Sequence, residues 1–168
     1  MVRVGLLVPP RELVRLEDLA VLGPWMLDCV RRVLPLGSAH LAPYIDLVER
    51  SLDPATPDPT PELRRQLEVL HAEEGEPHLE PLGTWPGSYH AVADALQVAL
   101  AARAPVPASP AEQRLKIGLR NNHALTAAFN AAMTAQRAAG VDELPWQAQR
   151  LLERLLGVAG AFEPLAPD

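Results

Sequence analysis

The chain has 168 residues, 48% of them hydrophobic, and a formal net charge of −6. This length suits one folded domain, 1–168, and the negative charge argues against nucleic-acid binding, which normally requires a basic surface. With Cys29 as the only cysteine, no intramolecular disulfide can form, and no apolar stretch is long enough to span a bilayer. We therefore expect a cytoplasmic protein.

Prolines divide the chain into stretches that each have the pattern of a helix. There are 18 of them, and proline is found between helices or in a first turn because it lacks an amide donor and clashes with the preceding turn. The pattern predicts an all-α, single-domain bundle of about seven helices. The proline-free stretches are 11–23, 25–34, 44–53, 62–76, 87–104, 111–144 and 146–163.

The N-terminal part is expected to contain an arm and two helices. Residues 1–9 are apolar and short, and they are predicted to lie on the bundle as an arm. A helix is expected over 11–22, with Gly23 and Pro24 ending it and starting the next one. The apolar side of that next helix, with Cys29, is expected to face the core. Its outward side is expected to carry Asp28, Arg31 and Arg32.

The middle of the chain alternates helices with proline-rich connections. Pro43 is compatible with a third helix only if that helix begins near Ala42. Residues 53–60 contain three prolines and predict a stiff, exposed linker. Thr60 then has the sequence context of a helix cap for the fourth helix, and an irregular loop is expected over 77–87 before the fifth.

The strongest local signal is the capping box that begins at Ser109 and contains a first-turn proline. It predicts an unbroken, central helix over 111–139 that Gly140 ends. Asp142 is expected to cap the last helix, and residues 164–168 are expected to form a flexible tail. The core face of the long helix is predicted to comprise Leu115, Leu119, Leu125, Phe129 and Met133.

No motif in the chain indicates a metal, a cofactor or a catalytic nucleophile. None of the five histidines belongs to an H-x-x-x-H or Glu-x-x-His pattern, so we expect no metal and no cofactor. Cys29 lies on an apolar stripe, which favours core packing over reactivity. His90 and Asp94 are four residues apart and can pair on one helix face.

Two polar groups are candidates for contact with a partner. Lys116, Arg120 and His123 share an outward face of the long helix, which favours either a solvated surface or a partner-binding one. A second group follows the fourth helix and would attract a basic partner, because like-signed acids speed the encounter with opposite charge. Its members are Glu73, Glu74, Glu76 and Glu80.

One segment, 22–36, resembles the opening helix of immunity proteins from bacterial polymorphic-toxin systems. Those proteins carry a Trp, then Asp-Cys or Asp-Ala, then a charged pair and Val-Leu-Pro-Leu, as Trp25 to Leu36 do here. Alanine-rich helices follow, which 89–103 and 124–139 match, and then a Trp-Gln helix like 146–152. The resemblance implies a non-enzymatic helical protein that neutralises a toxin by binding it.

Two other functions stay open at this level. The chain could be a structural or regulatory helical adaptor, or it could bind a small ligand or catalyse a reaction in a pocket between helices. For the latter, His90, Asp94 and His123 are the candidate residues. A neighbouring toxin gene would favour the immunity function, and a polar pocket with converging His and Asp side chains would favour the last.

Overall fold

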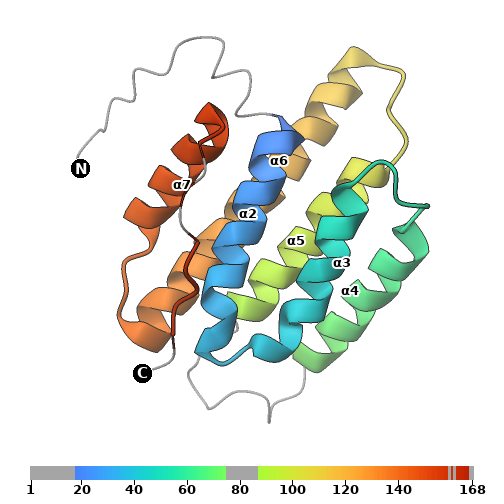
Figure 1. Ribbon diagram of the computed structural model, residues 1–168. Coiled ribbons are helices and arrows are strands. Elements are labelled where there is room, and N and C mark those ends of the chain that lie inside the picture. Colours follow the sequence, from blue (N-terminus) through green and yellow to red (C-terminus); the bar gives the residue numbers. More distant parts are fainter. Residues whose placement is uncertain (1–17, 75–86, 159, 161, 167–168) are drawn as a thin grey trace.

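The computed structural model describes residues 18–74, 87–158, 160 and 162–166, and these residues form an all-α bundle (Figure 1). The predicted fold class is confirmed, with six α-helices and two short 3-10 helices in the described part of the chain, against about seven expected. The α-helices are α2 (Leu19–Val33), α3 (Ala42–Leu52), α4 (Thr60–Glu74), α5 (Gly87–Arg103), α6 (Pro110–Ala139) and α7 (Leu144–Leu156). The 3-10 helices η1 (Leu34–Leu36) and η2 (Ala39–Leu41) join α2 to α3.

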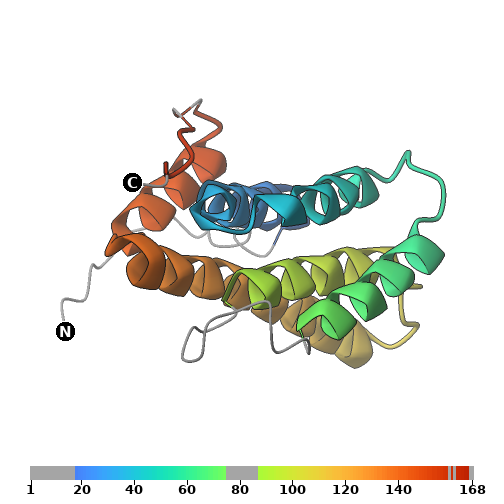
Figure 2. The same ribbon diagram turned by 90° about the horizontal axis from the view of Figure 1, so that it is seen from below.

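The helices lie in two layers that run roughly parallel to one another (Figure 2). One layer contains α7, α2 and α3, and the other contains α6, α5 and α4. Successive helices run in alternating directions along the bundle, as short connections between neighbours require. Among the described helices, none combines the length and the apolar character that a membrane crossing demands.

The predicted break at Gly23 and Pro24 is wrong, because α2 runs straight through it. Pro24 removes one intrahelical hydrogen bond, a cost of about 3 kcal/mol in a helix interior. Burial on both sides of the proline offsets that cost, since Leu22 and Trp25 are both in the core. Gly23 contributes space, because a Cβ there would lie 3.0 Å from Cδ1 of Leu52 on α3. The expected helix over 11–22 lies outside the described residues up to position 17.

Capping signals place the other helix ends well. α3 begins at Ala42 with Pro43 in its first turn, as the sequence predicts, and α4 begins at Thr60, the residue predicted as its cap. The Ser109 side chain accepts a hydrogen bond from the Glu112 amide at the start of α6. Gly140 ends the same helix with φ of 65°, a left-handed conformation that favours glycine.

The core lies between the two layers and is built from aliphatic and alanine side chains, with Trp25 and Tyr89 as its buried aromatics. Cys29 is buried there, as expected. On α7, Leu155 is buried, whereas Leu144 at the start of the helix is exposed. After α7 the chain returns along α2, where the Leu165 amide donates to the carbonyl oxygen of Arg32 at 2.9 Å.

Candidate functional site

Helix α6 buries one side, and apart from Asn130 that side is made of alanine. Its fully buried residues repeat at intervals of three and four, so they form one stripe along the helix. This stripe packs against α5 and α2. Side chains of one carbon let helix axes approach closely, so the contact is tight without large residues. The buried alanines are Ala124, Ala127, Ala128, Ala131, Ala132 and Ala135.

The opposite side of α6 carries large apolar side chains that face solvent. We name Leu115, Leu119, Leu125 and Phe129 the outer stripe; they are 64%, 55%, 53% and 58% exposed. The prediction that these residues form the core face is therefore wrong, and Met133 is only half-buried. Two apolar stripes with helical spacing run along this helix, and the alanine stripe packs in the core because it fits the narrow space between α6 and its neighbours.

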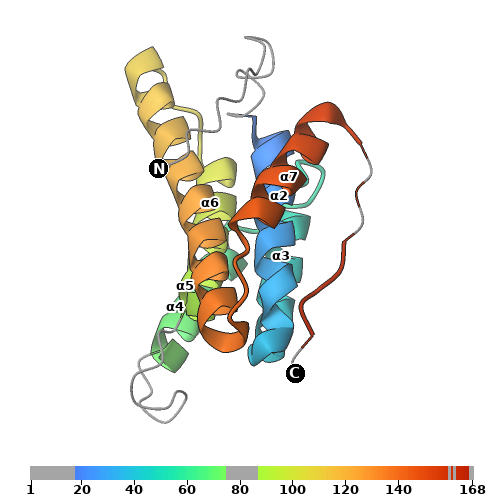
Figure 3. The same cartoon turned by 90° about the vertical axis from the view of Figure 1, so that its left-hand side faces the viewer.

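The first half of α6 extends beyond the rest of the bundle (Figure 3). Residues 111–123 include no buried residue, although α6 is continuous through them. Three exposed large apolar side chains lie on this half: Leu115, Ile117 and Leu119. An isolated helix gains little stability in water, so this half depends on continuity with the packed second half and on its hydrogen bonds to the connection that follows α5.

The polar residues predicted on this half of α6 have local roles. The Lys116 ammonium donates to the carbonyl oxygens of Ala104 and Pro105, at 2.5 and 3.2 Å, and so holds the connection between α5 and α6. The Arg120 guanidinium donates to Oδ1 of Asn121. Partial burial lowers the pKa of Arg120, and Asp18 opposes that shift.

His123 is tied to α5 by Asp94. Nδ1 of His123 donates to Oδ1 of Asp94 at 2.7 Å, and Nδ2 of Asn130 lies 3.5 Å from Oδ2 of the same carboxylate. His123 and Leu119 also line an open groove of about 970 Å³ beside α4 and α5. The structure therefore brings together two of the three residues named for a pocket, Asp94 and His123.

Charged side chains from three elements line the same groove. They are Asp58, before α4, with Arg64 on α4 and Arg103 on α5. Arg103 donates to the carbonyl oxygens of Asp53 and Thr56, so it holds the linker that precedes α4. The groove therefore contains one carboxylate and two guanidinium groups, and it opens to solvent.

The predicted acidic group is only partly described. Glu73 lies near the end of α4, where the Tyr44 hydroxyl donates to its Oε1 at 3.5 Å. The side chain of Glu74 and the residues Glu76 and Glu80 lie outside the described part of the chain. In Figure 1 the end of α4 and the start of α6 are at opposite ends of the bundle, so Glu73 does not share a surface with Lys116.

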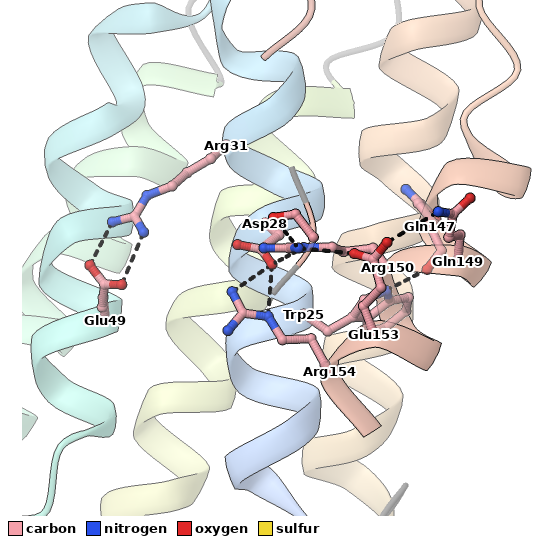
Figure 4. A network of polar contacts seen from close by, with 10 residues as sticks. Trp25, Asp28, Arg31, Glu49, Gln147, Gln149, Arg150, Glu153 and Arg154 are labelled. Carbon is pink, nitrogen blue, oxygen red and sulfur yellow. Dashed lines mark hydrogen bonds and ion pairs between the residues drawn. The ribbon is translucent and has the colours of Figure 1, made fainter. Parts of the chain in front are cut away.

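A polar network joins α2 to α7, and the sequence pattern of neither helix alone predicts it (Figure 4). Asp28, expected to face outward, is buried, and its Oδ2 accepts hydrogen bonds from Arg150 and Arg154 on α7. The Trp25 indole donates to the carbonyl oxygen of Gln147, whose amide donates in turn to that of Ala128. The expectation for Asp28 fails because its partners lie more than a hundred residues away.

A second ion pair lies beside this network. Nε of Arg32 donates to Oε2 of Glu143 at 2.6 Å, and the guanidinium lies 4.3 Å from the ring centroid of Trp146. Glu143 is only 2% exposed. The Asp28 pair joins α2 to α7, and the Arg32 pair joins α2 to the residue before α7, so each buried carboxylate has an opposite charge beside it.

Metal chemistry has no support in the described residues. Among them, no group of three or more His, Cys, Asp or Glu side chains is arranged to hold a metal ion. Nε2 of His40 lies 2.9 Å from the hydroxyl of Tyr89, in the first turn of α5.

The outer stripe of α6 is the candidate site, and the groove beside it is a second one.

Comparison of the chain with family models, with curated proteins and with solved structures gave no match. The similarity of 22–36 and 146–152 to immunity proteins therefore stays a prediction from the residues alone.

Proposed function

We propose that this protein is non-enzymatic and acts by binding another protein chain through the outer stripe of α6. The observation that carries the proposal is the exposure of all four outer-stripe side chains, each more than half accessible, on a helix whose other side is well packed. The largest contiguous apolar patch on a folded monomer covers about 300–600 Å² and is often an interaction site.

The more specific proposal is that the protein is a cytoplasmic immunity protein that neutralises a bacterial toxin. The resemblance of segment 22–36 supports it, as does a bundle whose buried polar groups serve to join helices. The net charge of −6 suits a basic toxin, because complementary charge speeds association. An adaptor that binds through the same stripe is the general form of this proposal.

The test is rescue of cells that express a toxin encoded beside this chain. The wild-type chain should restore growth and co-purify with the toxin, and Leu119→Ser and Phe129→Ser should lose both effects. Leu144→Ser is the matched control, because Leu144 is also exposed but lies on α7. Failure of the wild-type chain to rescue growth or to bind any neighbouring gene product would remove the immunity proposal.

A second candidate function is small-ligand binding or catalysis in the groove beside α6. The observation that favours it is the bond between Asp94 and His123, because a carboxylate on Nδ1 orients an imidazole for general-base work. If a ligand binds there, His123→Ala should abolish the ligand-induced rise in melting temperature, while His71→Ala, on exposed α4 surface, should not. A ligand screen without any rise for the wild-type chain would exclude this function.

A further inference from the structure

The outer stripe is symmetric about one residue, Asn122. Leu119 and Leu125 lie three residues before and after it, and Leu115 and Phe129 lie seven residues before and after it. On a helix of 3.6 residues per turn, positions three and seven away fall on one side, so Asn122 is at the centre of the stripe in both length and direction. Asn122 is itself exposed.

Such a stripe is complementary to a second copy of itself in antiparallel orientation. A two-fold axis through Asn122 places Leu115 against Phe129 of the other copy and Leu119 against its Leu125. The two Asn122 amides then face each other on the axis, where each can donate to and accept from its counterpart. Every large apolar residue of the outer stripe thereby gains an apolar partner.

A small residue and the position of α6 in the fold are compatible with close packing of the two α6 helices. Gly118, four residues before Asn122, would face Thr126 of the other copy, and no described atom lies within 4 Å of a Cβ built at Gly118. Since the buried alanines lie on the opposite side of α6, the two bundles would be on opposite sides of the paired helices. In Figure 3, α6 lies at one edge of the described bundle.

The helix dipole favours the antiparallel over the parallel orientation. Each helix carries partial positive charge at its N-terminus and partial negative charge at its C-terminus, and antiparallel pairing places opposite partial charges beside each other. Charged side chains add no preference, because Glu112 and Arg114 flank the outer stripe on opposite sides and Lys116 is turned to the carbonyl oxygens of Ala104 and Pro105.

We propose that this protein is a homodimer, in which the outer stripes of two α6 helices pack antiparallel about a two-fold axis at Asn122. This inference rests on the proposed function, because it uses the same surface: a second copy occupies the outer stripe in the free protein, and a toxin or other partner would displace it. The outer stripe would contribute roughly 500 Å² from each copy, about 1,000 Å² in total, which is the lower end for a specific interface. The dimer should therefore be reversible, with a Kd of micromolar order.

The first test is sedimentation velocity of the full chain without any toxin, at chain concentrations from about 1 µM to about 500 µM. The wild-type chain should shift from monomer to dimer, and Leu119→Asp should raise the Kd at least about tenfold with an unchanged far-UV circular dichroism spectrum. Leu144→Asp is the control and should dimerise normally. A wild-type chain that stays monomeric at every concentration would overturn the proposal.

The second test determines orientation by cysteine cross-linking, which native Cys29 does not disturb because it is buried. Asn122→Cys should form a disulfide-linked dimer on mild oxidation. Leu115→Cys should not, because the two copies of position 115 would be about 21 Å apart along the helices, well beyond disulfide reach. A mixture of Leu115→Cys and Phe129→Cys chains should cross-link with each other.

Efficient cross-linking of Leu115→Cys with itself would indicate parallel helices and overturn the proposed geometry. Absence of any cross-link from Asn122→Cys would overturn the interface. Both tests use the chain alone, so they can fail while toxin rescue succeeds, and they can succeed while rescue fails.

Discussion

Asp28 on α2 and Arg150 on α7 form an ion pair across the bundle, with Nε donating to Oδ2 at 2.8 Å and the two side chains only 11% and 10% exposed. Arg154 donates to the same carboxylate oxygen from the next turn of α7. One carboxylate therefore accepts hydrogen bonds from two guanidinium groups, and this contact attaches α7 to α2 together with the bond from Trp25 to Gln147. A buried charge that loses its partner is costly, because solvent cannot replace the lost interaction.

The first prediction follows from this pair. Asp28→Ala should lower the free energy of unfolding by about 3 kcal/mol, because it removes the carboxylate that Arg150 and Arg154 share and leaves the buried Arg150 guanidinium paired with the more exposed Glu153. Glu49→Ala is the control: Glu49 pairs with Arg31 at 2.8 Å, but both side chains are more exposed, so the loss should be below about 1 kcal/mol. Urea unfolding measures both, and equal losses would contradict the assignment of Asp28 as a buried anchor.

The second prediction compares the two sides of α6. Ala131→Leu should cost about 1–3 kcal/mol, because Ala131 is fully buried and the core cannot expand around a larger side chain. Phe129→Ala should cost less than about 1 kcal/mol at protein concentrations where the chain is monomeric, because the ring is exposed. A core position for Phe129 would instead produce a loss of about 3–5 kcal/mol in thermal or urea unfolding.

The third prediction concerns two glycines whose replacement by alanine should have opposite effects on stability. Gly140→Ala should destabilise the protein by about 1 kcal/mol, because φ at Gly140 is 65° and a Cβ is unfavourable there. Gly118→Ala should stabilise the monomer by up to about 1 kcal/mol, since Gly118 is an exposed, mid-helix residue with space for a Cβ. Differential scanning calorimetry of dilute samples should give a lower melting temperature for Gly140→Ala and a higher one for Gly118→Ala. A lower melting temperature for both variants would contradict the prediction for Gly118.

The fourth prediction is a pH dependence that depends on Cys29. Burial, followed by the charges of Asp28 and Glu143, raises the pKa of the Cys29 thiol well above its ordinary value of 9.0. Above pH 9 the unfolded chain therefore releases this proton while the native one keeps it, so stability should fall as the pH rises. The difference in unfolding free energy between wild type and Cys29→Ala should shrink by up to about 1.4 kcal/mol per pH unit there.

Thiol labelling provides an independent check on Cys29. The native wild-type chain should react with a disulfide reagent only as fast as it unfolds, and at full speed in denaturant. A constant stability difference between pH 8 and pH 10, or rapid labelling of the native chain, would place the thiol in a solvated environment.

Helix ends were predictable because their signals are local. Ser109 caps α6 through an amide three residues away, and Gly140 ends it through its own backbone conformation. The burial of α6 was not predictable by the same means. Both of its stripes have helical spacing, and hydrophobicity alone favours leucine over alanine for the core, whereas the space between neighbouring helices admits only alanine.

The polar contacts of the candidate sites lie beyond the reach of local pattern. Asp28 and Arg150 are 122 positions apart, and Asp94 meets His123 across two helices. Spacing within one helix could suggest that Asp94 pairs with an imidazole four residues away, but it could not show the contact with α6. Proline likewise has no fixed meaning without packing, since Pro24 lies inside a helix that the core holds together.

The alanine stripe of α6 places an asymmetric limit on how this chain can vary. Single-nucleotide changes in an alanine codon produce larger residues, with glycine as the one exception, so nearly every accessible change at Ala127 or Ala131 adds volume where none is available. Positions such as Leu115 and Phe129 have no such limit in the folded monomer. If the outer-stripe residues nevertheless stay the same among related sequences, association is what constrains them. That constraint can be separated from the one that folding places on the alanine stripe of the same helix.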